Sequence, residues 1–64
     1  MTRIKKARML AGMTQEEFGM KIGVSNVAVS NWENGKTFPN IKRLKRIAEV
    51  LGMPVDDLVE ERVM

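Results

Sequence analysis

Four neighbouring positions in the middle of the chain combine hydrogen-bonding side chains with one apolar side chain. These positions are Asn26, Val27, Ser30 and Asn31. In a helix that advances about 100° per residue, they share one face. Asparagine can pair with adenine, serine can donate to or accept from several bases, and an apolar group can contact the methyl group of thymine. Such side chains could contact the edges of nucleic-acid bases, and an ordinary polar helix face is the alternative.

The flanking residues predict two short helices joined by a tight turn, over residues 14–35. Thr14 can cap the first helix with its hydroxyl group, and Glu17 can bond back to the N–H of Thr14. Gly23 can adopt the positive φ that ends this helix, and Ser25 is a suitable N-cap for the next one. We therefore expect a helical corner whose second helix covers about residues 25–34.

Apolar residues lie where such a corner needs a core. They are Phe18 and Ile22 on the first helix, Val24 in the turn, and Ala28, Val29 and Trp32 on the second helix. Gly19 leaves room for a close approach of the two helices, although glycine costs about 1 kcal/mol of helix propensity relative to alanine. The face that carries Asn26 and Ser30 points away from this core.

Three further helices complete a prediction of one compact all-α domain of five helices, over residues 1–64. The first covers residues 2–11, with Ile4, Ala7 and Ala11 on its apolar stripe. The fourth follows an N-cap at Asn40 and packs on the corner through Ile41, Leu44, Ile47, Ala48 and Leu51. The last is a short helix that begins near Pro54 and buries Val55, Leu58 and Val59.

The composition argues against an enzyme and against a metal site. The chain has no histidine and no cysteine, which removes the usual nucleophiles, bases and zinc ligands. The acidic residues Asp56, Asp57, Glu60 and Glu61 are explained by the helix dipole and by solubility. We expect no catalytic residue, no metal, no cofactor and no evident small-molecule ligand.

The charge distribution favours a polyanionic partner. The net charge is +3, and four acidic residues fall within the last nine positions, which leaves a strongly basic body. Such a body suits nucleic acid, although basic side chains also form ordinary solvated helix faces. No apolar run reaches the roughly 20 residues that span a bilayer, and no signal-peptide core is present. We expect a cytoplasmic protein that does not associate with membranes.

Three runs together resemble the XRE family, which includes the repressor and Cro proteins of lambdoid phages. They are TQEEF at residues 14–18, GVS at 23–25 and WENGK at 32–36, followed by Pro39. The resemblance covers residues 3–60, and Gly19 departs from it because the family most often has alanine there. It implies a lambda-repressor-like fold with a helix-turn-helix at its second and third helices. It also implies a transcriptional regulator, expected to be a repressor, that binds double-stranded DNA.

The resemblance assigns roles to individual residues. It implies that Asn26, Val27, Ser30 and Asn31 contact bases in the major groove, and that Gln15, Asn34 and Lys36 contact phosphates. For Gln15 the alternative is an exposed residue of the first turn, and for Lys36 it is an idle surface charge. The resemblance also implies a partly buried ion pair between Arg8 and Glu33, in which both residues are structural.

One reading helix makes few base contacts, so we expect a homodimer on a roughly palindromic operator. The dimer forms either in solution or only on DNA. Candidate dimer contacts are apolar residues without a clear place in the core: Phe38, Pro39, Val59, Val63 and Met64. The alternative function is a helical protein-interaction module, similar to an antitoxin or adaptor, that does not read DNA bases.

Overall fold

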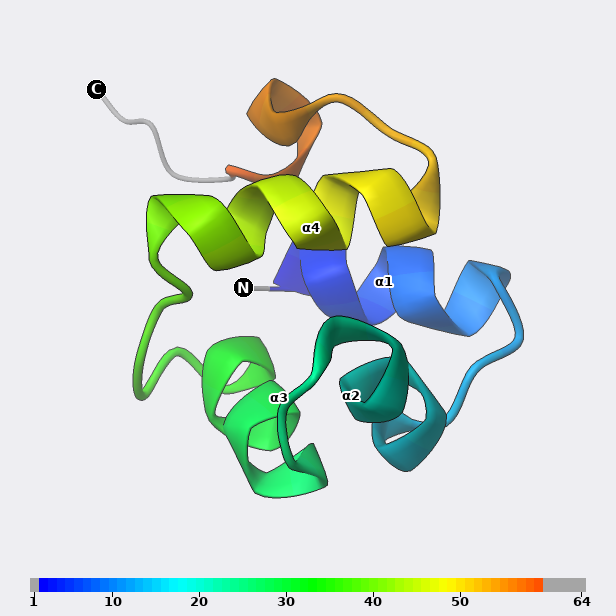
Figure 1. Ribbon diagram of the computed structural model, residues 1–64, viewed down its shortest axis with the longest axis vertical. Coiled ribbons are helices and arrows are strands. Elements are labelled where there is room, and N and C mark those ends of the chain that lie inside the picture. Colours follow the sequence, from blue (N-terminus) through cyan, green and yellow to red (C-terminus); the bar gives the residue numbers. More distant parts are fainter. Residues whose placement is uncertain (1, 60–64) are drawn as a thin grey trace.

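Figure 1 shows the computed structural model, which describes residues 2–59. Four α-helices and one 3-10 helix follow in the order α1 Thr2–Leu10, α2 Gln15–Ile22, α3 Asn26–Glu33, α4 Ile41–Leu51 and η1 Val55–Leu58. No strand occurs between residues 2 and 59, and the predicted all-α fold is confirmed. The expected short last helix is present as the 3-10 helix η1, in which the N–H of Asp57 donates to the carbonyl of Pro54 at 3.1 Å. Short segments commonly take this tighter form.

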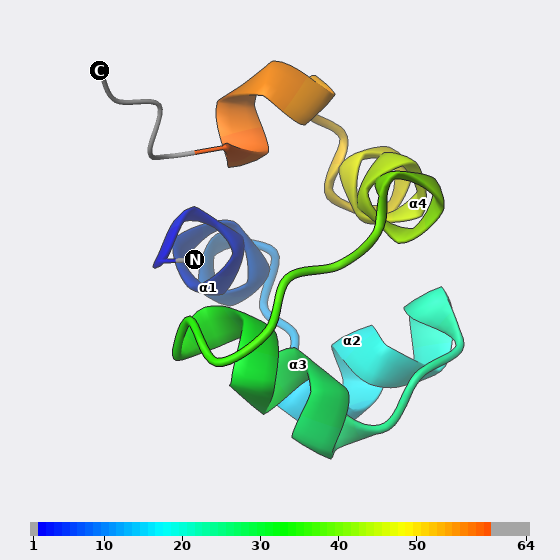
Figure 2. The same cartoon turned by 90° about the vertical axis from the view of Figure 1, so that its left-hand side faces the viewer.

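The helices form three layers along the long axis of the molecule. In Figures 1 and 2, α2 and α3 occupy one end, α1 and α4 the middle, and η1 the other end. Helices α2 and α3 pack on each other, and each also contacts one helix of the middle layer, α4 for α2 and α1 for α3. The corner formed by α2 and α3 is therefore supported from one side, while its other side faces outward.

Each of the five elements contributes one fully buried side chain to a single core. These are Ile4, Phe18, Val29, Ile47 and Leu58. Ile22, Trp32 and Ala48 complete the buried set at 5–6% exposure. Burying a side chain of this size stabilises a domain by about 1.5–3 kcal/mol, so the core rather than helix propensity holds the short helices together.

Local capping signals locate the corner as predicted. The N–H of Glu17 donates to the Thr14 hydroxyl oxygen at 3.0 Å, and the N–H of Thr14 donates to the Glu17 carboxylate at 2.9 Å. Gly23 ends α2 with a φ of 92°, and the Ser25 hydroxyl oxygen accepts from the N–H of Ala28 at 3.2 Å. Both helices of the corner therefore start at a side-chain cap.

Two residues expected in the core are exposed. Ala11 lies beyond the end of α1, which stops at Leu10, so it falls in the turn rather than on the apolar stripe. Ile41 is 64% exposed because it is the first residue of α4 and precedes the part of the helix that crosses the core. Arg8, rather than Ala11, is the second buried residue of α1.

Gly19 allows α2 to approach the turn more closely than any other residue would. A Cβ atom at this position would lie 2.6 Å from the carbonyl oxygen of Val24 and 3.3 Å from the backbone of Ser25. The carbonyl of Gly19 also accepts from the N–H groups of Gly23 and Val24, at 2.7 and 2.9 Å. The backbone of the turn therefore lies directly against α2.

We predict that Gly19→Ala destabilises the protein by up to about 2 kcal/mol. The added methyl group would displace backbone rather than a flexible side chain, which costs about 1–3 kcal/mol. This cost exceeds the gain of about 1 kcal/mol in helix propensity. Chemical denaturation followed by circular dichroism measures the change. The control is Met20→Ala in the same helix, where the side chain is 77% exposed and the change should stay within about 0.5 kcal/mol. An unchanged or raised stability for Gly19→Ala would show that the turn moves away freely.

Candidate nucleic-acid interface

The outward face of α3 carries the residues that the sequence singles out for base contacts. Asn26 is exposed and Val27 is 62% exposed, whereas Ser30 and Asn31 are half-buried. Val29 and Trp32, on the opposite side of the helix, belong to the core. The register of α3 therefore leaves amide, hydroxyl and apolar groups together on a surface that no other element covers completely.

The end of α3 folds back tightly, and this brings two of the candidate residues into contact. Asn34 donates from its side-chain amide to the Ser30 hydroxyl oxygen at 3.3 Å, and its backbone N–H donates to the Ser30 carbonyl at 2.9 Å. The N–H of Lys36 donates to the carbonyl of Asn31 at 2.9 Å. Lys36 is therefore held beside the last turn of α3 and does not lie on an extended loop.

Gln15 is the first residue of α2 and is half-buried, so it is not merely an exposed residue of the first turn. Its side-chain nitrogen donates to the Glu33 carboxylate oxygen Oε1 at 3.0 Å. This contact joins the start of α2 to the end of α3. Gln15 and Glu33 are 18 residues apart in the sequence, so no local pattern indicates that their side chains meet.

Arg8 and Glu33 form a buried ion pair that connects α1 with α3. The Nε atom of Arg8 lies 2.7 Å from Glu33 Oε2, and the two side chains are only 10% and 2% exposed. A second guanidinium nitrogen donates to Glu33 Oε1 at 3.3 Å, and a third donates to the carbonyl of Met13 at 2.7 Å. Arg8 therefore also fixes the loop that leads into α2.

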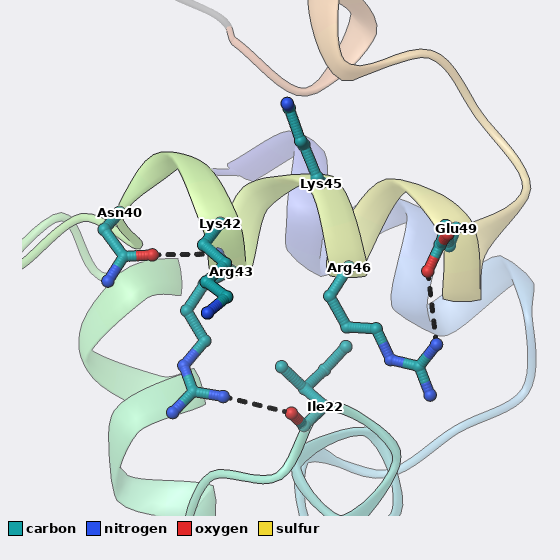
Figure 3. Close-up of a pocket in the computed structure, with 7 residues that line it drawn as sticks. All are labelled: Ile22, Asn40, Lys42, Arg43, Lys45, Arg46 and Glu49. Carbon is teal, nitrogen blue, oxygen red and sulfur yellow. Dashed lines mark hydrogen bonds and ion pairs between the residues drawn. The ribbon is translucent and has the colours of Figure 1, made fainter.

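The four basic residues of α4 form a cluster that has a structural use; they are Lys42, Arg43, Lys45 and Arg46. Figure 3 shows Arg43 reaching from α4 to the end of α2, where it donates to the carbonyl of Ile22 at 3.2 Å. Arg46 donates to the carbonyl of Lys21, also on α2, at 3.4 Å. Cations are favourable at a helix C-terminus. Lys45 points away from this contact (Figure 3). Two of the four basic side chains in this cluster therefore support the packing of α4 on α2.

The candidate dimer residues lie on different parts of the surface. Phe38 is 69% exposed, and Pro39 and Val59 are half-buried. Val63 and Met64 lie outside the described residues. Ile41 is a further exposed apolar residue, close to Phe38 in the chain. Helical spacing assigns Ile41 to the core, so it is not predicted as a dimer contact.

Within residues 2–59, no helix is long and apolar enough to cross a membrane. The same part of the chain holds no group of three or more histidine, cysteine, aspartate or glutamate residues that could bind a metal ion.

The chain matches a family described as helix-turn-helix over residues 4–58. It is 33% identical over 57 residues to the transcriptional activator BcrR of Enterococcus faecalis, covering 89% of this chain and 28% of the relative. It is 39% identical to an uncharacterized helix-turn-helix regulator of Archaeoglobus fulgidus, covering 89% of this chain and 81% of that protein.

Among solved structures, the chain is similar to the P22 c2 repressor in complex with synthetic operator 9T. The TM-score is 0.86 and the identity is 36%, over 91% of this chain and 88% of that one. A TM-score this high over 91% of the chain shows that the two chains share the same fold.

We predict that Arg8→Ala lowers the free energy of unfolding by about 3–5 kcal/mol, because it leaves the buried Glu33 carboxylate without its cation. Urea denaturation followed by circular dichroism measures the loss. Glu49→Ala is the matched control, since the Arg46–Glu49 pair is exposed on both sides, and it should cost less than about 1 kcal/mol. A loss below about 1 kcal/mol for Arg8→Ala would contradict a buried pair that the fold requires.

Proposed function

The chain belongs to the helix-turn-helix family, and we propose that it is a sequence-specific regulator of transcription that inserts α3 into the major groove of double-stranded DNA. The observation that carries this proposal is the outward face of α3, where hydrogen-bonding and apolar side chains lie exposed on a helix whose other face is in the core. The P22 c2 repressor, which has the same fold, binds an operator.

Direct base contacts come from Asn26, Val27, Ser30 and Asn31. Asparagine amides suit adenine, and Val27 suits the methyl group of thymine. Because the oxygen of Ser30 already accepts a hydrogen bond from Asn34, its hydroxyl proton is the group best placed to reach a base. Ser30 therefore favours bases that present acceptors, such as N7 and O6 of guanine or O4 of thymine.

Phosphate contacts flank the reading helix on both sides. Gln15 lies at the start of α2, where backbone N–H groups of a helix have no partner in the helix itself. Asn34 and Lys36 lie just beyond the end of α3. Contacts of this kind fix the position of a protein on the duplex, whereas the base contacts supply the specificity.

Repression by occupying an operator is the proposed regulatory outcome, as for the P22 relative, whereas BcrR is an activator. The proposed location is the cytoplasm, and we propose no cofactor and no metal. The rival function is a helical protein-interaction module, in which the polar face of α3 would contact protein. The observation that favours DNA is the placement of Lys36 and Gln15 beside that face.

Selection of binding sites from a random duplex library tests the proposed function, followed by affinity measurements as a function of salt. Neutralised phosphates make log K fall linearly with log salt, by about 0.9 per phosphate. We expect Lys36→Gln to reduce this slope by about 0.9. The control is Lys45→Gln, on a side chain that points away from α2 (Figure 3), and it should leave the slope unchanged. If no duplex is enriched or bound at about 50 mM salt, the protein-interaction module replaces this proposal.

We also propose binding as a homodimer through the exposed apolar residues Phe38 and Ile41. The selected sites should contain two inverted half-sites with centres about 34–36 Å apart. Phe38→Glu should weaken binding to the full site strongly and to an isolated half-site little, because it adds a charge where two copies meet. Leu10→Glu, at a residue that is 83% exposed on α1, is the control and should change neither. Protection of one asymmetric half-site by a single molecule would contradict dimeric binding.

Val27 generates a separate prediction, because it is the one apolar residue of the reading face. Replacing a contacted thymine with uracil removes one methyl group and should cost the parent protein about 0.8 kcal/mol. The same replacement should change the binding free energy of the Val27→Ala variant little. If uracil weakens both proteins equally at every position of the site, Val27 does not read methyl groups. If Val27→Ala unfolds the domain, the reading face is assigned wrongly, which is why denaturation is measured alongside.

A further inference from the structure

The buried carboxylate of Glu33 accepts hydrogen bonds from both Arg8 and Gln15. Its Oε2 atom accepts from Arg8 Nε at 2.7 Å, and its Oε1 atom accepts from a second nitrogen of Arg8 at 3.3 Å and from Gln15 at 3.0 Å. Arg8 and Glu33 are both buried, whereas Gln15 is half-buried. Gln15 therefore bridges the buried pair and the surface at which α2 begins.

This bridge fixes the orientation of the Gln15 carboxamide. Both oxygens of the Glu33 carboxylate accept hydrogen bonds from Arg8, so the atom of Gln15 that faces Oε1 must be the nitrogen. A carboxamide nitrogen carries two N–H groups in a plane. When one of them is bound to Glu33, the direction of the second is fixed as well.

The orientation matters because phosphate oxygens only accept hydrogen bonds. A carboxamide that is free to rotate can present either its nitrogen or its carbonyl oxygen, and only the nitrogen donates to a phosphate. Binding to Glu33 restricts this choice before DNA arrives, and preorganised contacts lose less entropy on binding. The negative charge of Glu33 does not itself repel the phosphate strongly, because the guanidinium of Arg8 lies 2.7 Å away.

We propose that Glu33 is a positioning residue for DNA binding, which orients the Gln15 carboxamide so that its second N–H donates to a backbone phosphate. Arg8 supports the same arrangement through its bond to the carbonyl of Met13, which immediately precedes the N-cap Thr14. This inference rests on the proposed function, since it concerns the contact through which Gln15 holds DNA. It goes beyond a purely structural role for the ion pair.

The parent protein without DNA provides the first test. Gln15 is the single glutamine of the sequence, so its side-chain N–H signals are easily assigned by NMR. We expect one of its two amide protons to exchange with water clearly more slowly than those of the exposed Asn26 side chain. Equal and fast exchange of both protons would overturn the inference, and this result does not depend on whether the protein binds DNA.

A double-mutant cycle provides the second test, with the selected duplex as the probe. Glu33→Asp keeps the charge that pairs with Arg8 but withdraws the carboxylate from Gln15. We expect it to weaken duplex binding about two- to tenfold, the range of one hydrogen bond, and to have almost no effect when Gln15→Met is already present. Equal weakening in both backgrounds would mean that Glu33 acts on stability alone, and would overturn the inference.

Glu49→Asp is the matched control, because Glu49 forms an exposed ion pair on α4, and it should leave duplex binding unchanged. Thermal denaturation establishes that each variant is folded at the temperature of the binding measurement. If Glu33→Asp does not fold, the exchange measurement on the parent decides the inference alone. If the parent protein binds no duplex, the proposed function is wrong. The exchange rates of the Gln15 amide protons then still show whether Gln15 is bound to Glu33.

Discussion

The buried pair of Arg8 and Glu33 is the interaction on which the position of α3, and with it the proposed DNA-binding face, depends. Removing two charges from water is costly, so such a pair is retained only where it makes further hydrogen bonds. Here the guanidinium binds Glu33 on α3 and the carbonyl of Met13 before α2, and Glu33 also accepts from Gln15 on α2. This one buried ion pair therefore fixes the relative positions of α1, α2 and α3 in a domain with a small apolar core.

Helix α3 has only eight residues, which is too short to be stable alone in water. The structure holds it at both ends. At its start, the turn that contains Val24 and Ser25 lies against α2 at Gly19, and at its end Glu33 is bound by Arg8. Val29 and Trp32 fix its rotation between these two points. The outward face of α3 is thus a rigid surface, although every side chain on it is free of the core.

Sequence reasoning succeeds where the determining interactions are local. The capping box of Thr14 and the glycine end of α2 involve residues that are adjacent or nearly so. Periodicity alone misplaces Ala11 and Ile41, because it does not indicate where a helix stops or which of its turns crosses the core. The contact of Gln15 with Glu33 joins separate helices and depends on the packing of the whole domain. For Gly19, the sequence predicts a close approach to α2. Only the folded structure shows that the approaching group is the backbone of Val24 and Ser25.

The proposed DNA-binding surface consists of α3 and the two segments that flank it. It can be mapped by titrating the isotope-labelled protein with the selected duplex and following its backbone amide signals by NMR. We expect the largest changes at Gln15, along residues 26–31 and at residues 34–36. The exposed face of α4 around Lys45 should change little. Changes concentrated on α4, or around Met9 and Leu10 on α1, would show that DNA binds to a different surface.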